Sequence, residues 1–321
     1  MAVRVEHSSL QFGARGDGTP WSIAVFTVHG SSDGPVSGVV AGVWGDKPIG
    51  VLAAHEVINA LATRDDLRGT VIVIPAANPG ALEIGSRVGP DALLLNRRFP
   101  GAASGFLTDQ TALHLSTYLG ERCGAVLDLH SGTPTMGLHY TYDFGHLPVS
   151  ASFGLLPVIP DRSHPTQLSA VMAARGIPSC LAEFGGGRST SIDDGVTGTL
   201  NFLRARGHLM EPLQAPSLLP IMRNIQLVLA STNGIWEHRA DARVSASITA
   251  GHFGVVRCAQ TGRVLEDVVV SGDGVLLMMT TGPHMVQPGG FLCMIGHHDG
   301  DVAVPEAGEL EHVGHNVSGG K

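Results

Sequence analysis

The chain has 321 residues, of which 43% are hydrophobic and 15% charged, and its formal net charge is −8 at pH 7. This length and composition are typical of a globular protein of about two domains and exclude a disordered chain. The negative net charge and the lack of any Lys/Arg-rich run argue against nucleic acid as a partner.

The N-terminal sequence "MAVRVEHSSLQF" lacks the apolar core of a signal peptide, and no apolar run reaches membrane-spanning length. We therefore expect no membrane partner. The cysteines are scattered without a CxxC pair, which predicts reduced thiols and a cytoplasmic protein. Apart from the C-terminal Lys321, every basic residue is arginine except one, Lys47.

Short apolar runs alternate with segments of helical periodicity from about residue 21 to residue 206. Strands are predicted over 22–30, 37–45, 69–78, 124–132, 137–144 and 177–186, because these runs are rich in Val and Ile and bounded by Gly or Pro. Apolar spacing predicts helices over 48–64, 108–122, 165–176 and 191–210. This order predicts an α/β domain, a mostly parallel sheet flanked by helices, with sites at the carboxyl ends of its strands.

The pattern changes after residue 218. Short alternating runs follow one another, separated by Gly and turn residues, and no segment of helical periodicity is evident. We therefore expect an α/β catalytic domain over residues 1–218 and a small all-β domain over residues 219–321. The last residues, 306–321, are expected to form a loose tail.

Four segments carry residues suited to chemistry: "GVWGDKPIG" (42–50), "NPGALEIGSRVGPDALLLNRRFPG" (78–101), "LDLHSG" (127–132) and "LAEFGGG" (181–187). In the third, Asp128 and His130 are two residues apart on a predicted strand, so their side chains face the same side. In the fourth, Glu183 ends a predicted strand just before a Gly-rich loop.

In this order and spacing the segments resemble the succinylglutamate desuccinylase/aspartoacylase family, relatives of the zinc carboxypeptidases. Members carry a His-Gly-x-Glu pair after a strand, an NP…R…DLNRxFPG segment, a DLH strand and a late Glu-x-Gly. Residues 232–296 also resemble the family's C-terminal barrel-like domain. The resemblance covers nearly the whole chain and implies a zinc carboxypeptidase-like fold, deacylase (amide hydrolase) activity and a zinc cofactor.

The resemblance also implies roles for single residues. Glu183 matches the general base, and Arg87 matches the arginine that polarises the scissile carbonyl. Asn96 and Arg97 match the pair that grips a substrate carboxylate, and His130 matches the third zinc ligand. These residue types suit the tasks, because an Arg fork fits a carboxylate bidentately, fixed positive charge stabilises an oxyanion, and a carboxylate can shuttle protons.

The sequence departs from the family pattern at three positions. Trp44 stands where the first ligand His belongs, Lys47 where the ligand Glu belongs, and Leu94 where the Asp of DLNR belongs. A catalytic zinc needs three protein ligands, of which only His130 remains, and the ammonium of Lys47 would repel the ion. Zinc in its usual form is therefore not expected. Asp46, Asp128 and His139 are candidate substitutes, although Asp128 more naturally orients His130.

Three functions remain open. The first is an enzyme that acts on the amide bond of a small carboxylate-bearing molecule, such as an N-acyl amino acid, with Lys47 in place of the cation. Such a site would also suit acyl transfer or elimination. The second is a zinc-dependent N-acyl amino acid deacylase with substitute ligands, and the third is a non-catalytic protein that binds a small carboxylate. We predict the first, acting in amino-acid metabolism, and a homo-oligomer is compatible with it.

Overall fold

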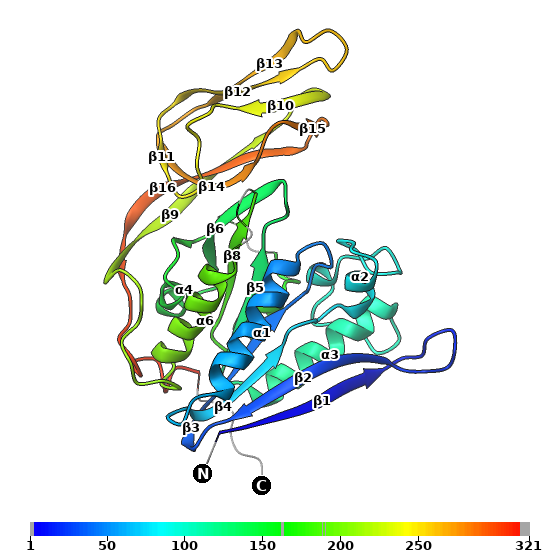
Figure 1. Cartoon of the computed structure of the whole chain (residues 1–321), viewed down its shortest axis with the longest axis vertical. Coiled ribbons are helices and arrows are strands. Elements are labelled where there is room, and N and C mark those ends of the chain that lie inside the picture. The colour runs from blue at the N-terminus through cyan, green and yellow to red at the C-terminus, as the bar shows by residue number, and fades with distance from the viewer. Residues whose placement is uncertain (1–2, 162–163, 188, 190, 315–321) are drawn as a thin grey trace.

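The computed structural model describes residues 3–161, 164–187, 189 and 191–314 (Figure 1). Helices and strands alternate through the first two thirds of the chain. The strands there are β1 (Arg4–Phe12), β2 (Trp21–His29), β3 (Ser32–Ala41), β4 (Arg68–Ile74), β5 (Ala125–Ser131), β6 (Met136–Asp143), β7 (Pro157–Val158) and β8 (Ser179–Gly186). The helices are α1 (Pro48–Ala62), α2 (Pro79–Glu83), α3 (Leu107–Arg122), α4 (Leu147–Ser152), α5 (Leu168–Ala174) and α6 (Asp193–Ala205), with a 3-10 turn η1 (Leu95–Arg97).

These strands form a mixed sheet in the order β1-β2-β4-β3-β5-β8-β6-β7. The central strands β4, β3, β5 and β8 run parallel to their neighbours within this group. On one side β1, β2 and β4 pair antiparallel, and on the other β6 pairs antiparallel with β8 but parallel with β7. The expectation of a mostly parallel sheet is therefore not confirmed beyond the centre. The chain passes without a helix from β1 into β2, from β2 into β3 and from β5 into β6, and each of these turns reverses its direction, whereas α1 joins the parallel strands β3 and β4.

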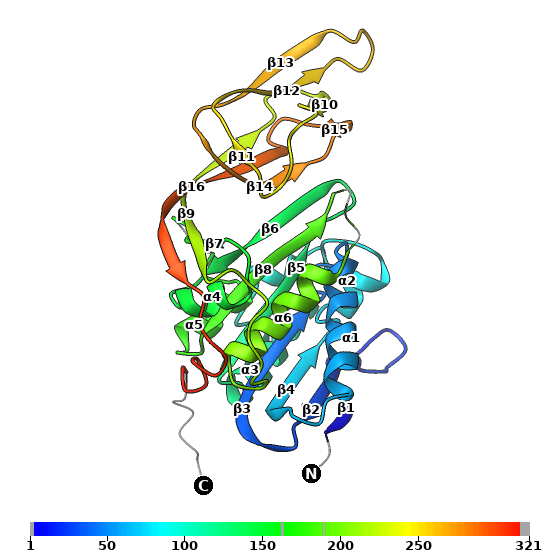
Figure 2. The ribbon, with the colours of Figure 1, turned by 60° about the vertical axis from the view of Figure 1, so that its left-hand side comes forward.

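The central strands are apolar on both faces because helices cover both. Successive residues of β5 illustrate this, since Leu127 packs in the core beneath α1 and α6 and Val126 packs in the core beneath α3 and α5. Figure 2 shows α1 and α6 on one face of the sheet. Every residue of β5 is buried, as expected for a strand between two helical layers. The carboxyl ends of β3, β5 and β8 consequently reach one edge of the layered core.

The last third of the described chain contains strands only. They are β9 (Leu218–Leu229), β10 (Gly234–His238), β11 (Ser247–Ile248), β12 (Gly251–Arg257), β13 (Val264–Val270), β14 (Gly274–Thr280), β15 (His284–Val286) and β16 (Phe291–Ala303). A four-stranded sheet, β13-β12-β10-β15, packs on β14 and the upper parts of β9 and β16 around a core that includes Trp236, Phe253 and Ile295. An all-β C-terminal segment is thus present, as its alternating sequence predicts.

The two parts of the chain are joined more closely than a boundary at residue 218 suggests. β9 pairs with β7 and β16, and β14 pairs with β6, so that one twelve-stranded sheet runs through both parts. The expected loose tail also needs correction within the described residues. Leu310 is 5% exposed in the core beside α6, and the Arg206 guanidinium donates to the backbone carbonyls of Leu310 and Val313. Residues 315–321 lie outside the described part of the chain.

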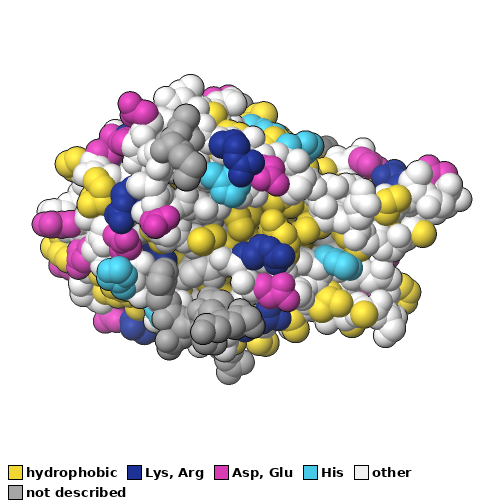
Figure 3. All heavy atoms as spheres, turned by 90° about the horizontal axis from the view of Figure 1, so that it is seen from below, with side chains coloured by type: hydrophobic (Ala, Val, Ile, Leu, Met, Phe, Trp, Pro, Cys, Tyr) yellow, Lys and Arg dark blue, Asp and Glu magenta, His cyan; other side chains and the backbone are white. Residues whose placement is uncertain are grey.

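Helix hydropathy, the cysteines and the surface charges can each be compared with what the sequence predicts. None of the described helices is long and apolar enough to cross a membrane. All four cysteines are free, and Cys123, Cys180 and Cys293 are buried. On the face shown in Figure 3, acidic and basic side chains are interspersed around hydrophobic ones, and no continuous basic area is visible.

The buried His208 predicts a pH dependence of stability. Its Nδ1 donates to the Arg68 carbonyl (2.8 Å) and its Nε2 accepts from the Ser37 hydroxyl (2.9 Å). Burial, with the charges of Arg206 and Arg68, lowers the pKa of His208 from 6.5 to about 4. Between these values the unfolded chain binds a proton that the folded chain does not, so this group removes about 3 kcal/mol of stability as the pH falls from 6.5 to 4.

Chemical unfolding of the native chain and of His208→Gln across this pH range checks the expectation. The variant should be less stable at pH 7 but should lose less stability on acidification. Parallel pH profiles for the two proteins would contradict the assignment.

Candidate active site

A cavity of about 700 Å³ lies where the edge of the α/β part meets the C-terminal strands. Its polar wall comes from the loops after β3 and β4, from β5 and β8, and from the segment before α5: Trp44, Lys47, Arg87, Asn96, Arg97, His130, His164, Gln167 and Glu183. Apart from the candidate substitute ligands, the residues to which the sequence analysis assigns a role line this one cavity, although they span positions 47–183 of the chain: Lys47, Arg87, Asn96, Arg97, His130 and Glu183.

The loop after β3 brings Trp44 and Lys47 into the cavity. Gly42 makes the turn with φ 68°, and a Cβ at this position would lie 2.9 Å from the Pro75 carbonyl oxygen, so only glycine fits. Lys47 follows as the N-cap residue of α1, with Pro48 in the first helical turn. The Trp44 indole lies edge-on to the His130 ring, with centroids 6.1 Å apart.

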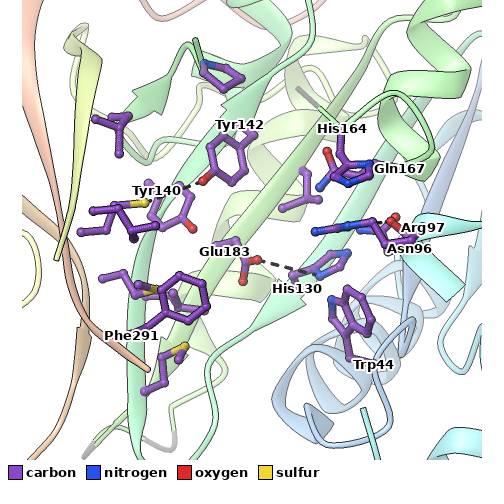
Figure 4. A pocket seen from close by; sticks show the side chains of 18 of the residues that line it. Trp44, Asn96, Arg97, His130, Tyr140, Tyr142, His164, Gln167, Glu183 and Phe291 are labelled. Atoms are coloured by element: carbon purple, nitrogen blue, oxygen red, sulfur yellow. Dashed lines mark hydrogen bonds and ion pairs between the residues drawn. The ribbon is translucent and has the colours of Figure 1, made fainter. Parts of the chain in front are cut away.

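An ion pair between Lys47 and Glu183 occupies the centre of the polar wall. The Lys47 Nζ lies 3.4 Å from Glu183 Oε2, and the two side chains are 6% and 12% exposed. Glu183 and His130 are register partners on the parallel strands β8 and β5, which places both side chains on the same face, with 3.9 Å between His130 Nδ1 and Glu183 Oε1. Figure 4 shows Glu183 and His130 pointing toward one another. The only internal lysine of the sequence is thus a buried cation beside a carboxylate.

Asp128 lies behind His130, away from the cavity. Its Oδ1 is 3.1 Å from His130 Nε2, but neither imidazole nitrogen and neither Asp128 oxygen makes a hydrogen bond within the described residues. Asp128 is not among the residues that line the cavity, and its role in orienting His130 stays a prediction. Nδ1 is left facing Glu183 with no hydrogen-bonding partner, which makes it available to a bound molecule.

The side chains present do not fit a catalytic zinc ion with three protein ligands. Across the described residues, no three His, Cys, Asp or Glu side chains are grouped so that they could hold a metal ion. His130 offers one nitrogen to the cavity, and the nearest carboxylate, that of Glu183, is already paired with Lys47. A dication next to this ammonium would be repelled, because the interior screens the two charges weakly.

Two arginines on the polar wall lack a carboxylate partner in the described part of the chain. The Arg87 guanidinium lies over the Trp44 indole, 4.4 Å from its centroid, and the Arg97 Nη1 donates to the Asn96 carbonyl (2.6 Å). Burial first, and then the charge of Arg87, lowers the pKa of Arg97. Two cations that raise each other's energy, beside a cavity, form a site that an anion would stabilise.

Asn96 is held rather than free to turn. Its Oδ1 accepts the backbone N–H of Leu168 at the start of α5 (3.0 Å), and the residue is almost fully buried. The Oδ1 contact directs the amide group, so Asn96 helps to fix the η1 turn that carries Arg97 as well as lining the cavity.

The sequence did not single out several cavity residues. Tyr140 and Tyr142 lie on β6, where alternate residues share a face, and their rings pack edge-to-face with centroids 5.0 Å apart. Burial raises the pKa of both phenols, so they remain protonated and can donate hydrogen bonds at neutral pH. The two-residue spacing of "LHYTYD" was the signal available, since it places residues 138, 140 and 142 on one side of the strand.

The remaining candidate ligands lie elsewhere. His139, which precedes Tyr140 on β6, points to the face opposite the two tyrosines, and its Nδ1 contacts the Ser245 hydroxyl (2.6 Å). Neither Asp46 nor His139 is among the residues that line the cavity.

Comparisons with known proteins agree with this architecture. A sequence profile of the succinylglutamate desuccinylase/aspartoacylase catalytic domain matches residues 33–206, which is more than half of the chain. The chain belongs to this family. One curated member, the N-alpha-acetyl-L-2,4-diaminobutyric acid deacetylase of Halomonas elongata, is 32% identical over 137 residues. That match spans 42% of this chain and only 40% of the relative. The family is one of deacylating enzymes.

Solved structures show the same fold over nearly the whole chain. The product-bound ectoine utilization protein EutE (DoeB) of Ruegeria pomeroyi aligns with a TM-score of 0.81 and 22% identity, covering 91% of this chain and 95% of that one. A succinylglutamate desuccinylase/aspartoacylase from Rhodobacter sphaeroides aligns with a TM-score of 0.79 and 20% identity, covering 92% and 95%. These likenesses confirm the family's architecture, including its C-terminal strands.

Proposed function

We propose that this member of the family acts on the amide bond of a small N-acyl amino acid, with Lys47 in the place of the family's zinc ion. The observation that carries the proposal is the buried Lys47–Glu183 pair, which lies in the same cavity as two arginines without carboxylate partners in the described chain. Trp44 and Lys47 then stand where relatives carry ligands. The curated relative, a deacetylase by name, supports the reaction class.

The residues divide the work in this proposal. The carboxylate of the substrate binds Arg97, whose desolvated guanidinium gains an anion. The ammonium of Lys47 and the guanidinium of Arg87 stabilise the negative charge that develops on the carbonyl oxygen. Glu183 takes the proton of the attacking nucleophile and passes it to the leaving amine. Because one ammonium cannot generate hydroxide as zinc does, we expect amide hydrolysis at this site to be slow, and acyl transfer from an activated donor would be easier.

Glu183→Gln tests the assignment of the base. The substitution keeps the size of the side chain and removes its proton affinity, so it should lower turnover by about 100- to 10,000-fold. Release of free amine from N-acetyl and N-succinyl amino acids is the measurement. Glu237→Gln is the matched control, because Glu237 of β10 pairs with Arg257 of β12 outside this cavity.

Chelator treatment separates the proposal from its alternatives. Turnover that survives removal of metal supports the Lys47 site. Turnover that disappears with chelator and returns with zinc would support a zinc deacylase with substitute ligands. Binding of N-acyl amino acids without turnover of any of them would support a protein that only binds carboxylates.

A further inference from the structure

The wall of the cavity opposite the arginines is apolar. Four of its residues, Leu138, Met278, Met294 and Leu227, form a row across neighbouring strands, because Leu138 pairs with Met278, and Met294 pairs with Leu227. The shared register of β14 and β16 places Met278 beside Met294 and so joins the two pairs. This wall is therefore built by the joint between the two parts of the chain.

The reactive groups lie between the apolar wall and the arginines. In Figure 4, Glu183 lies between Phe291 and Tyr140 on one side and Asn96 and Arg97 on the other. An amide held with its carboxylate at Arg97 and its carbonyl near Glu183 would therefore extend its acyl group toward Phe291 and the methionines. Figure 3 shows that hydrophobic side chains also gather near the centre of one outer face of the molecule.

The apolar wall selects against a charged acyl group. Among the described residues of this half of the cavity, namely the four of the row with Ile225 and Phe291, none carries a charge that could neutralise a second carboxylate or an ammonium. Burying such a charge without a partner is unfavourable, whereas hydrocarbon gains free energy there. Methionine side chains are flexible and polarizable, so they can adapt to chains of different length.

Resting on the proposed function, we infer that the acyl group of the substrate is an apolar chain of several carbons rather than acetyl or succinyl. The cavity of about 700 Å³ has the size of sites that enclose drug-sized ligands. The strands β9, β14 and β16 thereby determine the specificity, and residues 44–183 hold the carboxylate and the reacting bond.

Calorimetric binding of N-acylglycines tests this inference without requiring turnover. The probes are N-acetyl-, N-butanoyl-, N-hexanoyl- and N-succinylglycine, measured with the native chain and with Glu183→Gln. Each added methylene should lower Kd by about fourfold, so hexanoyl, with four more methylenes, should bind about 250-fold more tightly than acetyl. Succinyl should bind at least about tenfold more weakly than butanoyl, which has the same chain length.

Leu227→Ser should flatten the dependence on chain length. Leu227 is 46% exposed, so the substitution leaves the packed core intact. Leu265→Ser is the matched control, since Leu265 is 36% exposed on β13 and does not line the cavity. Equal Kd values across the series, tightest binding of the succinyl probe, or equal flattening by the control would overturn the inference.

Turnover of the same probes is measured separately. Chain-length-dependent binding without glycine release would refute the proposed chemistry and leave the apolar acyl site standing. Glycine release at equal efficiency from the acetyl and hexanoyl probes would support the proposed chemistry and refute the apolar acyl site.

Discussion

Replacing Lys47 with methionine is expected to lower kcat by about 100- to 1000-fold, the range seen when one preorganised oxyanion donor is lost. The thioether has nearly the shape of the lysine side chain but no charge. The change would leave Glu183 and the carbonyl of the substrate without their nearest cation, since Nζ lies 3.4 Å from Glu183 Oε2 in the native chain. Steady-state kinetics on the best N-acyl amino acid measure the effect.

Two further variants make the Lys47 result specific. Arg98→Met removes a cation next in sequence to the cavity, but Arg98 pairs with Asp109 outside it, so kcat should stay near the native value. Lys47→Ala opens space for a small amine, and added methylammonium should restore part of its activity. Native kcat in Lys47→Met, with a native thermal transition, would refute a catalytic role for the ammonium.

The paired substitution Trp44→His with Lys47→Glu is expected to create a zinc site. Both positions lie close to His130. The Trp44 ring contacts the His130 ring, and the Lys47 ammonium pairs with Glu183, whose carboxylate also lies beside His130. The pair would add an imidazole and a carboxylate to the one imidazole present, giving the three-ligand set of a catalytic zinc site. We expect zinc affinity at least about 1000-fold above that of the native chain, because binding to a complete N/O ligand set is worth many kcal/mol.

Calorimetric titration with zinc and metal analysis after dialysis measure this gain. Adding His130→Ala to the pair should abolish it, and Trp44→His alone, which keeps the ammonium, should show little. An unchanged zinc affinity in the pair would mean that these two positions do not correspond to the ligand positions of the relatives. Stoichiometric zinc in the native chain would equally contradict the idea that Lys47 replaces the metal.

The sequence predicted the strands of the α/β core that are buried on both faces. Runs such as "AVLDLHS" are continuously apolar or buried because helices cover both faces, and the helices between them carry their own periodicity. β1 was not anticipated, because its residues are nearly all exposed and their order shows no apolar alternation. Its place is fixed instead by its long antiparallel pairing with β2, which local pattern does not encode.

The candidate site divides in the same way. Local sequence marked Lys47, Arg87, Asn96, Arg97, His130 and Glu183, because each stands in a short segment with turn residues at fixed offsets, and the resemblance supplied their roles. The prediction that Trp44 and Lys47 stand where relatives carry zinc ligands also comes from the sequence alone. Only the tertiary structure decided that the Lys47 ammonium is buried against Glu183. It also decided that strands β14 and β16, distant along the chain, form the opposite wall of the cavity. The physical reason is that residue types are local properties, whereas burial and charge pairing depend on which strands become neighbours.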